Sequence, residues 1–390
     1  RRPGGDVPMI ATDTLHTLQV GKGWFPEQSG GLNRYYHELL RHLPPMGVEV
    51  TGLVAGSGFV TSQSSGVVRS FAPSDASLPA RLNQVRREVQ RELRDNPSSL
   101  FVTHFALYAA PCLDLLREHP VVVHFHGPWA AESRTEGAGA LATGLKHWLE
   151  RAVYRRGSRY IVLSNAFGRL LSRGHGVSPD LIRVIPGGVD TTRFAPAHTR
   201  EDARALLGWP ADRPIALVVR RLVRRMGLED LISAVRLARR AVPDLLVIIA
   251  GSGPLRDELT RRAADIAENV RLAGYLPDSD LPLAFRAADF SVVPSVALEG
   301  FGLIVAESLA AGTPVLVTNV GGLPETLAGF AEACVIRDRS QAGLAAAISD
   351  AVHGRLPLPS ADACVRHARQ SFDWTVVASR VRDVYAEAAA

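Results

Sequence analysis

Short, fully apolar runs with high β propensity alternate with helical patterns along most of the chain. The clearest runs are 100–104, 121–126, 214–219, 245–250 and 290–294. Strands without a polar face are typical of parallel sheets that helices cover on both sides. The alternation therefore predicts an α/β fold built on parallel sheets.

The alternation breaks off near the middle of the chain and then begins again. With 390 residues, the chain is long enough for two domains with separate cores. The polar, proline-containing stretch 195–203 is the natural linker. We therefore expect an N-terminal domain in 1–193 and a C-terminal domain in 194–372. Residues 373–390 carry the pattern of a last amphipathic helix.

The stretch 294–307 places two carboxylates, Glu299 and Glu307, in an apolar run that holds no cation. Gly300 and Gly302 lie between them, and glycine lets the backbone approach a ligand closely. A helical pattern begins just after Gly302, so its unpaired N–H groups would point at a ligand there. From the spacing alone, two glutamates that cap and solvate a helix are an equal alternative.

Glycine turns follow strands in both halves of the chain. Gly30 and Gly31 lie between a predicted strand, 17–21, and a helical pattern that begins at 32. Strand, glycine loop and helix together can cradle a phosphate, although most such pairs are plain turns. Gly253 lies in a second strand-to-helix turn.

The run 121–126 ends with two histidines, His124 and His126. The carboxyl ends of parallel strands are where α/β sheets bind ligands. We expect the two side chains to face opposite sides of the strand and therefore to be poor joint metal ligands. His126, which Gly-Pro follows, is the one that we expect to face the ligand.

The Glu-x7-Glu pattern, in its Pro-Ser…Glu-Gly-Phe-Gly…Ala-Glu setting, resembles the donor-sugar signature of retaining family 4 glycosyltransferases. The run 185–190, Ile-Pro-Gly-Gly-Val-Asp, is similar to the segment that ends the N-terminal domain in that family. The resemblance covers nearly the whole chain. It implies the GT-B fold, in which two Rossmann-like domains have parallel sheets that face each other across a cleft.

The family pattern also has Gly-Arg-Leu followed by a lysine before a glycine. Arg221 matches that arginine, whereas Arg220 replaces the first glycine and Met226 replaces the lysine. Arg225, with Arg224 as the alternative, would then supply the second cation. Two cations are expected where a nucleotide diphosphate leaves, because they neutralise its developing charge. Without the Glu-x7-Glu run, a solvated arginine-rich loop would be the better interpretation.

The resemblance implies a role for each matching residue. The catalytic group would be His126, Arg221, Arg225 and Glu299. The donor-binding group would be Gly30, Gly31, Gly253, Leu276, Gly300, Phe301, Gly302, Leu303 and Glu307, with Glu307 on the ribose. Acceptor-side residues would be Trp129, Glu132 and Arg134. We reject the Asp-x-Asp at 278–280 as a metal site, since Asp280 is placed as a helix N-cap.

The implied reaction is the transfer of a hexose from a nucleotide diphosphate sugar to a hydroxyl of a glycan, lipid or small molecule. Retention of the anomeric configuration, no metal and no cofactor are expected, with a UDP-sugar favoured as donor and GDP-mannose next. The alternatives are a nucleotide-sugar epimerase or phosphorylase of the same fold. A non-catalytic nucleotide-sugar-binding protein is another alternative, which Met226 favours.

Charge and cysteine content bear on location and partners. The first 190 residues hold 21 basic and 16 acidic residues, whereas the rest hold 23 of each, so the whole net charge of +5 lies in the first half. Such a half can attract an acidic or membrane-bound acceptor, and a solvated surface is the alternative. Nucleic acid is not expected as a partner. Three scattered cysteines and no evident signal peptide predict a cytoplasmic protein, with contact to the inner membrane face left open.

Overall fold

The computed structural model describes residues 15–135, 137, 139–195 and 197–390, and it contains two parallel sheets. The first sheet has the order β3-β2-β1-β4-β5-β6-β7. Its strands are β1 (Leu15–Val20), β2 (Val48–Ala55), β3 (Val68–Ala72), β4 (Leu100–Thr103), β5 (Val121–Phe125), β6 (Arg159–Val162) and β7 (Ile182–Val184). Every pair of neighbouring strands in it is parallel.

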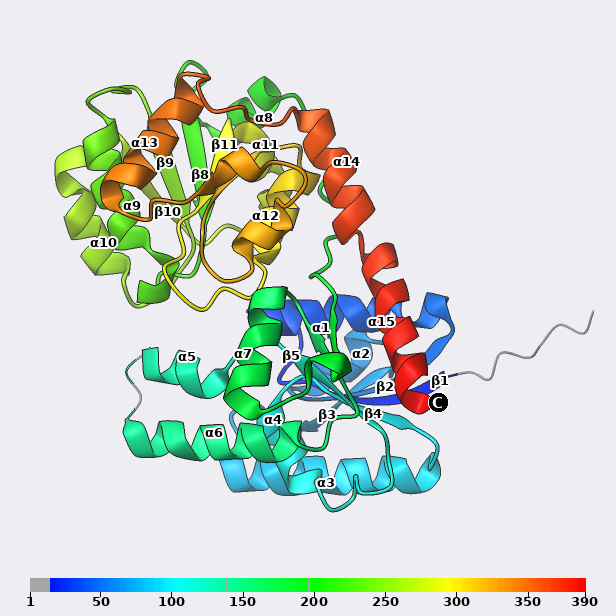
Figure 1. Cartoon of the computed structure of the whole chain (residues 1–390). Coiled ribbons are helices and arrows are strands. Elements are labelled where there is room, and N and C mark those ends of the chain that lie inside the picture. Colours follow the sequence, from blue (N-terminus) through cyan, green and yellow to red (C-terminus); the bar gives the residue numbers. More distant parts are fainter. Residues whose placement is uncertain (1–14, 136, 138, 196) are drawn as a thin grey trace, which may run out of the picture.

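The second sheet has the order β10-β9-β8-β11-β12-β13 and is also parallel. Its strands are β8 (Ile215–Val219), β9 (Leu246–Ala250), β10 (Val270–Gly274), β11 (Phe290–Val293), β12 (Val315–Thr318) and β13 (Val335–Ile336). The sequence prediction of an α/β fold with two parallel sheets is therefore confirmed. The two sheets lie in separate domains, one below the other in Figure 1.

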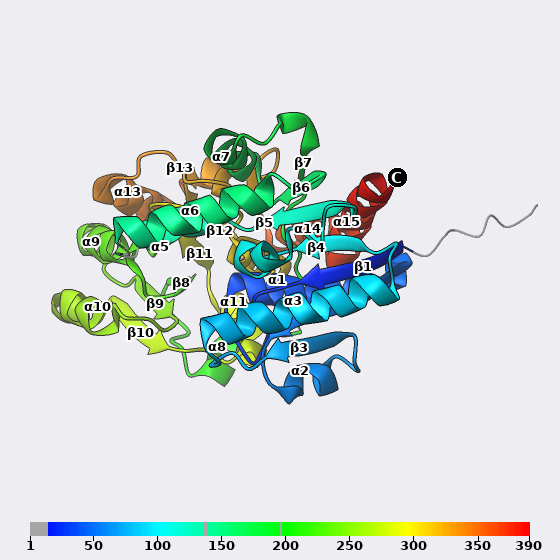
Figure 2. The same cartoon turned by 90° about the horizontal axis from the view of Figure 1, so that it is seen from below.

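Helices cover both faces of the N-terminal sheet, as the alternation of its buried side chains requires. In β5, Val121 and Val123 pack in one core with α3, while Val122 packs in another with α1. Figure 2 shows α3 and α6 on the near face of this sheet. The helices of this half are α1 (Gly31–His42), α2 (Gly58–Gln63), α3 (Leu78–Asp95), α4 (Ala106–Ala109), α5 (Trp129–Thr135), α6 (Ala140–Tyr154) and α7 (Asn165–His175).

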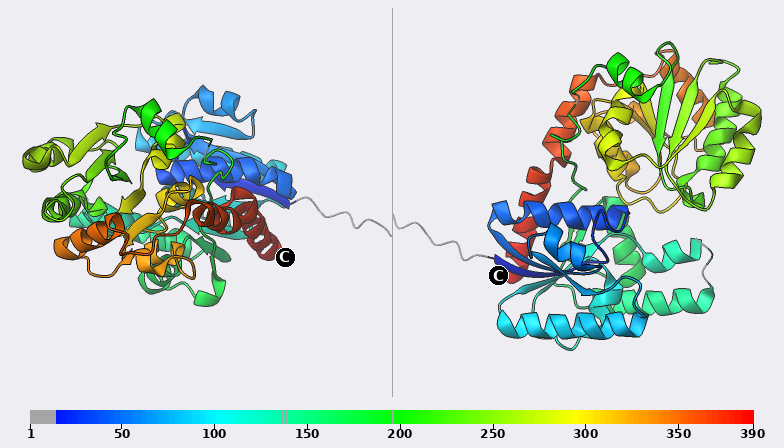
Figure 3. Two further views of the ribbon diagram at one scale, coloured as in Figure 1. Left: turned by 90° about the horizontal axis from the view of Figure 1, so that it is seen from above. Right: turned by 180° about the vertical axis from the view of Figure 1, so that it is seen from behind.

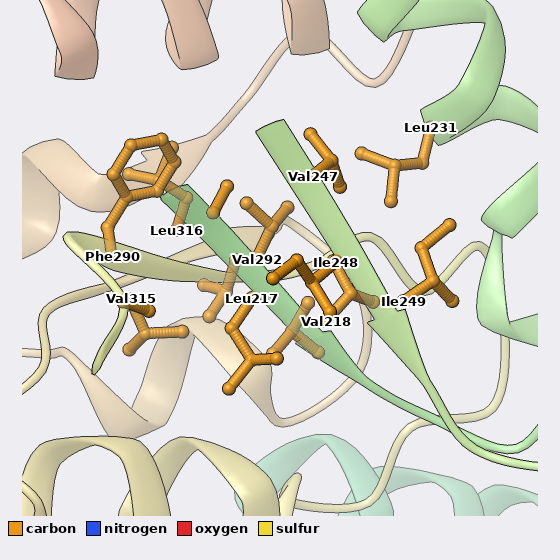
Figure 4. Close-up of a cluster of buried hydrophobic side chains, with 14 of the residues drawn as sticks. Leu217, Val218, Leu231, Val247, Ile248, Ile249, Phe290, Val292, Val315 and Leu316 are labelled. Carbon is orange, nitrogen blue, oxygen red and sulfur yellow. The ribbon is translucent and has the colours of Figure 1, made fainter. Parts of the chain in front are cut away.

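The C-terminal sheet is apolar on both faces and carries one continuous core. Leu217, Ile248 and Val292 come from adjacent strands and are buried together (Figure 4). The helices that surround them are α8 (Arg200–Leu207), α9 (Leu228–Ala238), α10 (Arg256–Ala263), α11 (Leu281–Ala287), α12 (Leu303–Ala310), α13 (Gln341–Val352) and α14 (Ala361–Phe372).

The last helix, α15 (Trp374–Ala389), returns to the N-terminal domain (Figure 3). Trp374 and Tyr385 are buried in the core that α1 shares with the first sheet. The turn before α15 is fixed by a hydrogen bond of 2.7 Å from the Val189 N–H to the Phe372 carbonyl. Helices α1 and α15 therefore contribute to one core, and α15 ties the two domains together.

No helix in the described part of the chain is long and apolar enough to span a bilayer. The three cysteines, Cys112, Cys334 and Cys364, are buried and free.

Candidate functional site

The segment 294–307 leaves β11 and enters α12 at the edge of the C-terminal domain that adjoins the N-terminal domain (Figure 1). Leu298, just before the first glutamate, has a φ of 51°, which is uncommon for a residue with a side chain. Gly302 caps α12 with a φ of 79°, where glycine costs least. The first N–H groups of α12 have no partner inside the helix and are available to an anion.

Glu299 lies in a dense set of hydrogen bonds. Its carboxylate pairs with Arg220 and accepts a bond of 3.1 Å from the Ser295 hydroxyl. The Arg225 guanidinium donates to the Leu298 carbonyl at 3.1 Å, beside this pair. Burial by itself would raise the pKa of Glu299, but Arg220 and Arg225 together hold it below the ordinary value. Glu299 is therefore an ionised carboxylate at neutral pH.

Glu307 is partnered across the domain boundary. Arg34, on α1 just after the glycine loop, lies 3.4 Å from its carboxylate and also pairs with Asp278. Arg193 donates to the same Asp278 carboxylate at 2.7 Å. Burial raises the pKa of Glu307, and the cations of Arg34 and Arg193 offset only part of that rise. The pKa values of the two glutamates in this motif are thus shifted in opposite directions.

Several glycines let backbone segments touch around this motif. A Cβ on Gly227, which has a φ of 70°, would lie 1.9 Å from the Pro294 carbonyl oxygen. A Cβ on Gly321, with a φ of 56°, would lie 2.0 Å from the Glu299 carbonyl oxygen. Side chains at these two positions would push the loop that carries Glu299 out of place, so the sequence needs glycine there.

The N-terminal domain contacts the motif directly. A Cβ on Gly187 would lie 2.5 Å from Leu303, and one on Gly31 would lie 3.9 Å from the same side chain. A Cβ on Gly300 would lie 2.6 Å from the ring of Phe167 on α7. The structure therefore brings the predicted glycine loop at Gly31 next to the N-terminus of α12.

One expectation about the histidines is wrong. His124 and His126 are two residues apart on a strand, so their side chains point to the same side rather than to opposite sides. Their rings stack at 6.0 Å, and His104 stacks on His124 at 4.1 Å. One candidate ligand atom from each of the three histidines lies within 4.8 Å of the others. The expected opposite facing of His124 and His126 was therefore not a valid reason to exclude a metal. Their near-parallel rings are nevertheless a poor fit, because a metal ion lies close to the plane of each ring that binds it.

Hydrogen bonds fix the proton positions in this histidine stack. The Gln19 amide N–H₂ donates to the Thr17 hydroxyl at 3.2 Å, so its carbonyl oxygen faces His104 Nε2, 3.1 Å away, and accepts that proton. His104 Nδ1 is then the acceptor in the 3.2 Å contact with His126 Nε2, which carries the proton. This leaves His126 Nδ1 as an unprotonated acceptor. Burial lowers the pKa of His126 to about 3, so the ring is neutral.

The stack also reaches α15. The Tyr385 hydroxyl lies 2.7 Å from His124 Nε2 and donates to Gln19 Oε1 at 3.4 Å. The helix that crosses back from the C-terminal domain is thereby hydrogen-bonded to the histidines at the end of β5.

The predicted cations are placed unequally. Arg225 lies beside the Glu299 loop, and 3.9 Å separates its guanidinium from the Glu132 carboxylate on α5. Arg221 is exposed and has no hydrogen bond or ion pair within the described part of the chain. Arg220, which we did not select, is the arginine that contacts Glu299. The structure therefore joins Arg220, Arg225 and Glu299 but not Arg221.

The other predicted residues are spread around the same boundary. Phe301 and Gly302 are buried, whereas Gly30 is exposed. Gly253 packs on the Leu222 carbonyl, and Leu276 is half-buried after β10. Of the acceptor-side group, Glu132 faces Arg225, Arg134 is exposed, and Trp129 lies under the Lys146 ammonium at 4.8 Å.

Sequence reasoning missed Arg34, Arg193, Arg220 and Asp278. Arg34 had a usable signal, because it is a cation in the first turn after Gly30-Gly31. Arg220 stood where the family pattern has a glycine, and Asp278 belonged to the Asp-x-Asp that we had rejected as a metal site. Their contacts join residues between 79 and 273 positions apart, which no local pattern contains.

Two protein-family models match the chain. The model described as Glycosyltransferase Family 4 matches residues 29–193, and the model described as Glycosyl transferases group 1 matches residues 199–371. The two matches divide the chain as its two sheets do.

Curated relatives agree with these matches. A D-inositol 3-phosphate glycosyltransferase of Streptomyces scabiei is 33% identical, over 98% of this chain and 91% of its own length. A glycogen synthase of Mycobacterium tuberculosis is 31% identical, over 95% and 94%. A GDP-mannose-dependent phosphatidylinositol monomannoside mannosyltransferase of Mycolicibacterium smegmatis is 32% identical, but over 51% of this chain and 55% of its own length.

Solved structures share the fold. Sucrose-phosphate synthase from Thermosynechococcus elongatus superimposes with a TM-score of 0.76 at 23% identity, covering 96% of this chain and 98% of that one. Anabaena HepE in complex with UDP and glucose superimposes with a TM-score of 0.75 at 19% identity, covering 96% and 100%. The two-domain GT-B architecture is thereby shown.

Proposed function

Because the chain belongs to glycosyltransferase family 4, we propose that it transfers a hexose from a nucleotide diphosphate sugar to an acceptor hydroxyl with retention at the anomeric carbon. The glycosyltransferase activity and the class of donor follow from the family. Retention, the hexose and independence of metal are the proposed part. A UDP-sugar is the favoured donor, and GDP-mannose is the second candidate, which the name of the M. smegmatis relative supports.

One observation carries the proposal: a largely buried, ionised Glu299, whose side chain is 13% exposed, lies beside the N-terminus of α12 at the boundary between the two domains. Arg220 and Arg225 place two cations next to it. A carboxylate suits sugar hydroxyls, whereas cations and free N–H groups suit a diphosphate. A sugar diphosphate needs both kinds of partner close together. Residues 294–307 and 220–225 supply them.

In the proposed complex, Glu307 binds the ribose and Glu299 binds the sugar hydroxyls. Because Arg34 contacts Glu307 in the structure, a bound ribose would have to share or replace that contact. Arg225, Arg220 and the first N–H groups of α12 would stabilise the negative charge that develops on the leaving diphosphate. Arg221, which is exposed, would have to turn inward to take part.

His126 would lie against the sugar as a hydrogen-bond acceptor through Nδ1. Its pKa of about 3 makes it neutral at physiological pH, so it is not suited to donate a proton as a general acid. In a same-face mechanism the leaving phosphate oxygen accepts the proton of the acceptor hydroxyl. No strong protein base is then required, in contrast to the carboxylate pairs of glycosidases.

Thermal unfolding with UDP, GDP, ADP and dTDP, followed by the matching sugar nucleotides, tests the donor site. The correct nucleotide raises the melting temperature, because binding stabilises the folded state by RT ln(1 + [L]/Kd). Release of that nucleotide is then measured with and without candidate acceptors. In Glu299→Gln we expect nucleotide release to fall about 100-fold, since charge contacts of this kind are worth about 3 kcal/mol. Near wild-type release in Glu299→Gln would reject the site, and release of an epimer without acceptor would favour an epimerase.

A further inference from the structure

Helix α6 carries an apolar stripe that the rest of the protein leaves uncovered. Leu141, Leu145 and Trp148 are 92%, 60% and 64% exposed. Their spacing of four and three residues places them on one side of the helix. The opposite side is buried, with Glu150, Val153 and Tyr154 packed against the domain. Three large apolar side chains in one exposed row are unusual for a surface that faces only water.

Arginines border this stripe and leave the surface positively charged. They are Arg151 on α6, Arg155 at the C-cap of α6, and Arg169 and Arg173 on the neighbouring helix α7. All four are exposed, and their side chains have no ion pair or hydrogen bond within the described residues. The single acidic residue of the two helices is Glu150, which is buried and accepts a 2.7 Å bond from the Trp129 N–H. We call the three apolar residues and these four arginines the α6–α7 surface.

Three other arginines close to α6 and α7 in the sequence already have partners. Arg159 and Arg183 both pair with Glu387 on α15. Arg156 donates to the Leu116 carbonyl at 2.9 Å. The four arginines of the α6–α7 surface therefore remain available, as do Arg87, Arg94, Arg117 and Arg134 elsewhere on the domain.

We propose that the α6–α7 surface docks on an anionic lipid bilayer. Leucine and tryptophan partition into the boundary between head groups and acyl chains, and arginines attract anionic head groups. A bilayer with anionic lipid offers an apolar boundary to the three apolar residues and negative head groups to the four arginines. Charge complementarity favours this occupant over a second copy of the chain, which would oppose four arginines with four more.

The α6–α7 surface lies on the far side of α6 from the proposed catalytic site, and this relation to a lipid-borne acceptor rests on the proposed function. Helix α5 packs on α6 and lies on the side of it that faces the C-terminal domain (Figure 1). It carries Glu132, which is 3.9 Å from Arg225. Because Lys146 and Glu150, which contact α5, lie on the side of α6 opposite the stripe, a lipid head group would have to extend past both helices to reach the site.

Vesicle flotation tests the proposal with phosphatidylcholine vesicles that contain or lack phosphatidylglycerol. We expect the wild-type protein to float only with the anionic vesicles and to be released by salt. We expect Leu145→Glu/Trp148→Glu and, separately, Arg169→Gln/Arg173→Gln to bind the anionic vesicles at least about tenfold more weakly. Leu206→Glu, at a position on α8 that is 63% exposed, and Arg261→Gln on α10 are matched controls that should bind normally.

Two results would overturn the proposal. One is wild-type binding that is absent, or that the α6 and α7 variants leave unchanged. The other is a wild-type dimer in solution that Leu145→Glu/Trp148→Glu converts to monomers, because the surface would then join two copies of the chain. Stabilisation by the donor nucleotide is measured on the same proteins and should be equal in all of them. If no donor nucleotide stabilised the wild-type protein, the proposed function would be rejected, but the result on lipid binding would not be affected.

Discussion

At the scale of single residues, the environment rather than the residue type decides what each titratable group can do. Glu307 is buried and Glu299 is largely buried, yet the cations beside Glu299 lower its pKa, while burial keeps that of Glu307 raised. His126 is neutral, and its Nδ1 is an acceptor only because Gln19 orients His104. The protonation of His126, the proposed sugar-facing group, thus depends on Gln19 and His104, which are not proposed to contact the sugar.

His104 is accordingly a positioning residue, and its replacement should change the state of His126. In His104→Phe we expect His126 to lose its fixed tautomer, and turnover to fall up to about tenfold, the worth of one hydrogen bond. His104→Gln can accept from His126 and donate to Gln19, so it should restore most of the loss. Nitrogen NMR of His126 should show an unprotonated Nδ1 in the wild-type protein and in His104→Gln. A protonated Nδ1 in the wild-type protein would contradict the assignment.

At the scale of elements, the segment 294–307 keeps its shape because neighbouring backbones come very close to it. Gly227 lies at the start of α9, and the Pro294 carbonyl occupies the space that a side chain there would need. Gly321 approaches the Glu299 carbonyl in the same way. Strained Leu298 is held in this setting, as is common at functional loops.

Gly227→Ala should therefore destabilise the protein more than its backbone angle alone explains. Gly208→Ala is the matched control, because Gly208 has a similar φ of 62° and no atom within 4 Å of the added Cβ. We expect the control to cost about 1 kcal/mol and Gly227→Ala to cost about 2–4 kcal/mol, the additional part coming from the clash. Denaturant unfolding measures both. Equal costs would show that the close contact with Pro294 is not a constraint.

The elements themselves could be predicted from sequence, whereas their side-chain partners could not. The apolar runs at 100–104 and 290–294 correspond to β4 and β11 because period and burial are local properties. From its family position, Arg221 was predicted to contact the leaving diphosphate, but the arginine that pairs with Glu299 is Arg220. His124 and His126 were wrongly predicted to point to opposite sides of the strand, although the two-residue period of a strand places them on the same side.

At the scale of the whole molecule, the two domains are joined by polar contacts that lie next to the proposed donor site. Asp278 of the C-terminal domain pairs with Arg34 and Arg193 of the N-terminal half. Glu325 accepts bonds of 2.7 and 2.9 Å from the N–H groups of Asn165 and Ala166 at the start of α7. The domain arrangement and the site therefore depend on some of the same side chains.

Asp278→Asn should loosen this arrangement without unfolding either domain, because it removes the charge that both arginines share. We expect a larger radius of gyration in X-ray solution scattering and a loss of stability of about 1 kcal/mol, as for partly exposed ion pairs. Asp265→Asn is the matched control, since its pair with Arg236 lies within the C-terminal domain. An unchanged radius of gyration in Asp278→Asn would show that these pairs do not hold the domains together.

Donor hydrolysis followed by proton NMR tests the central claim most directly, since it needs no knowledge of the acceptor. The enzyme is supplied with the α-linked sugar nucleotide that stabilises it, and the anomer of the released sugar is recorded before mutarotation. Transfer to water on the same face predicts that the α-anomer appears first and that Glu299→Gln suppresses its formation. Initial release of the β-anomer, or α-anomer release that is unaffected in Glu299→Gln, would contradict a retaining transferase built on this site.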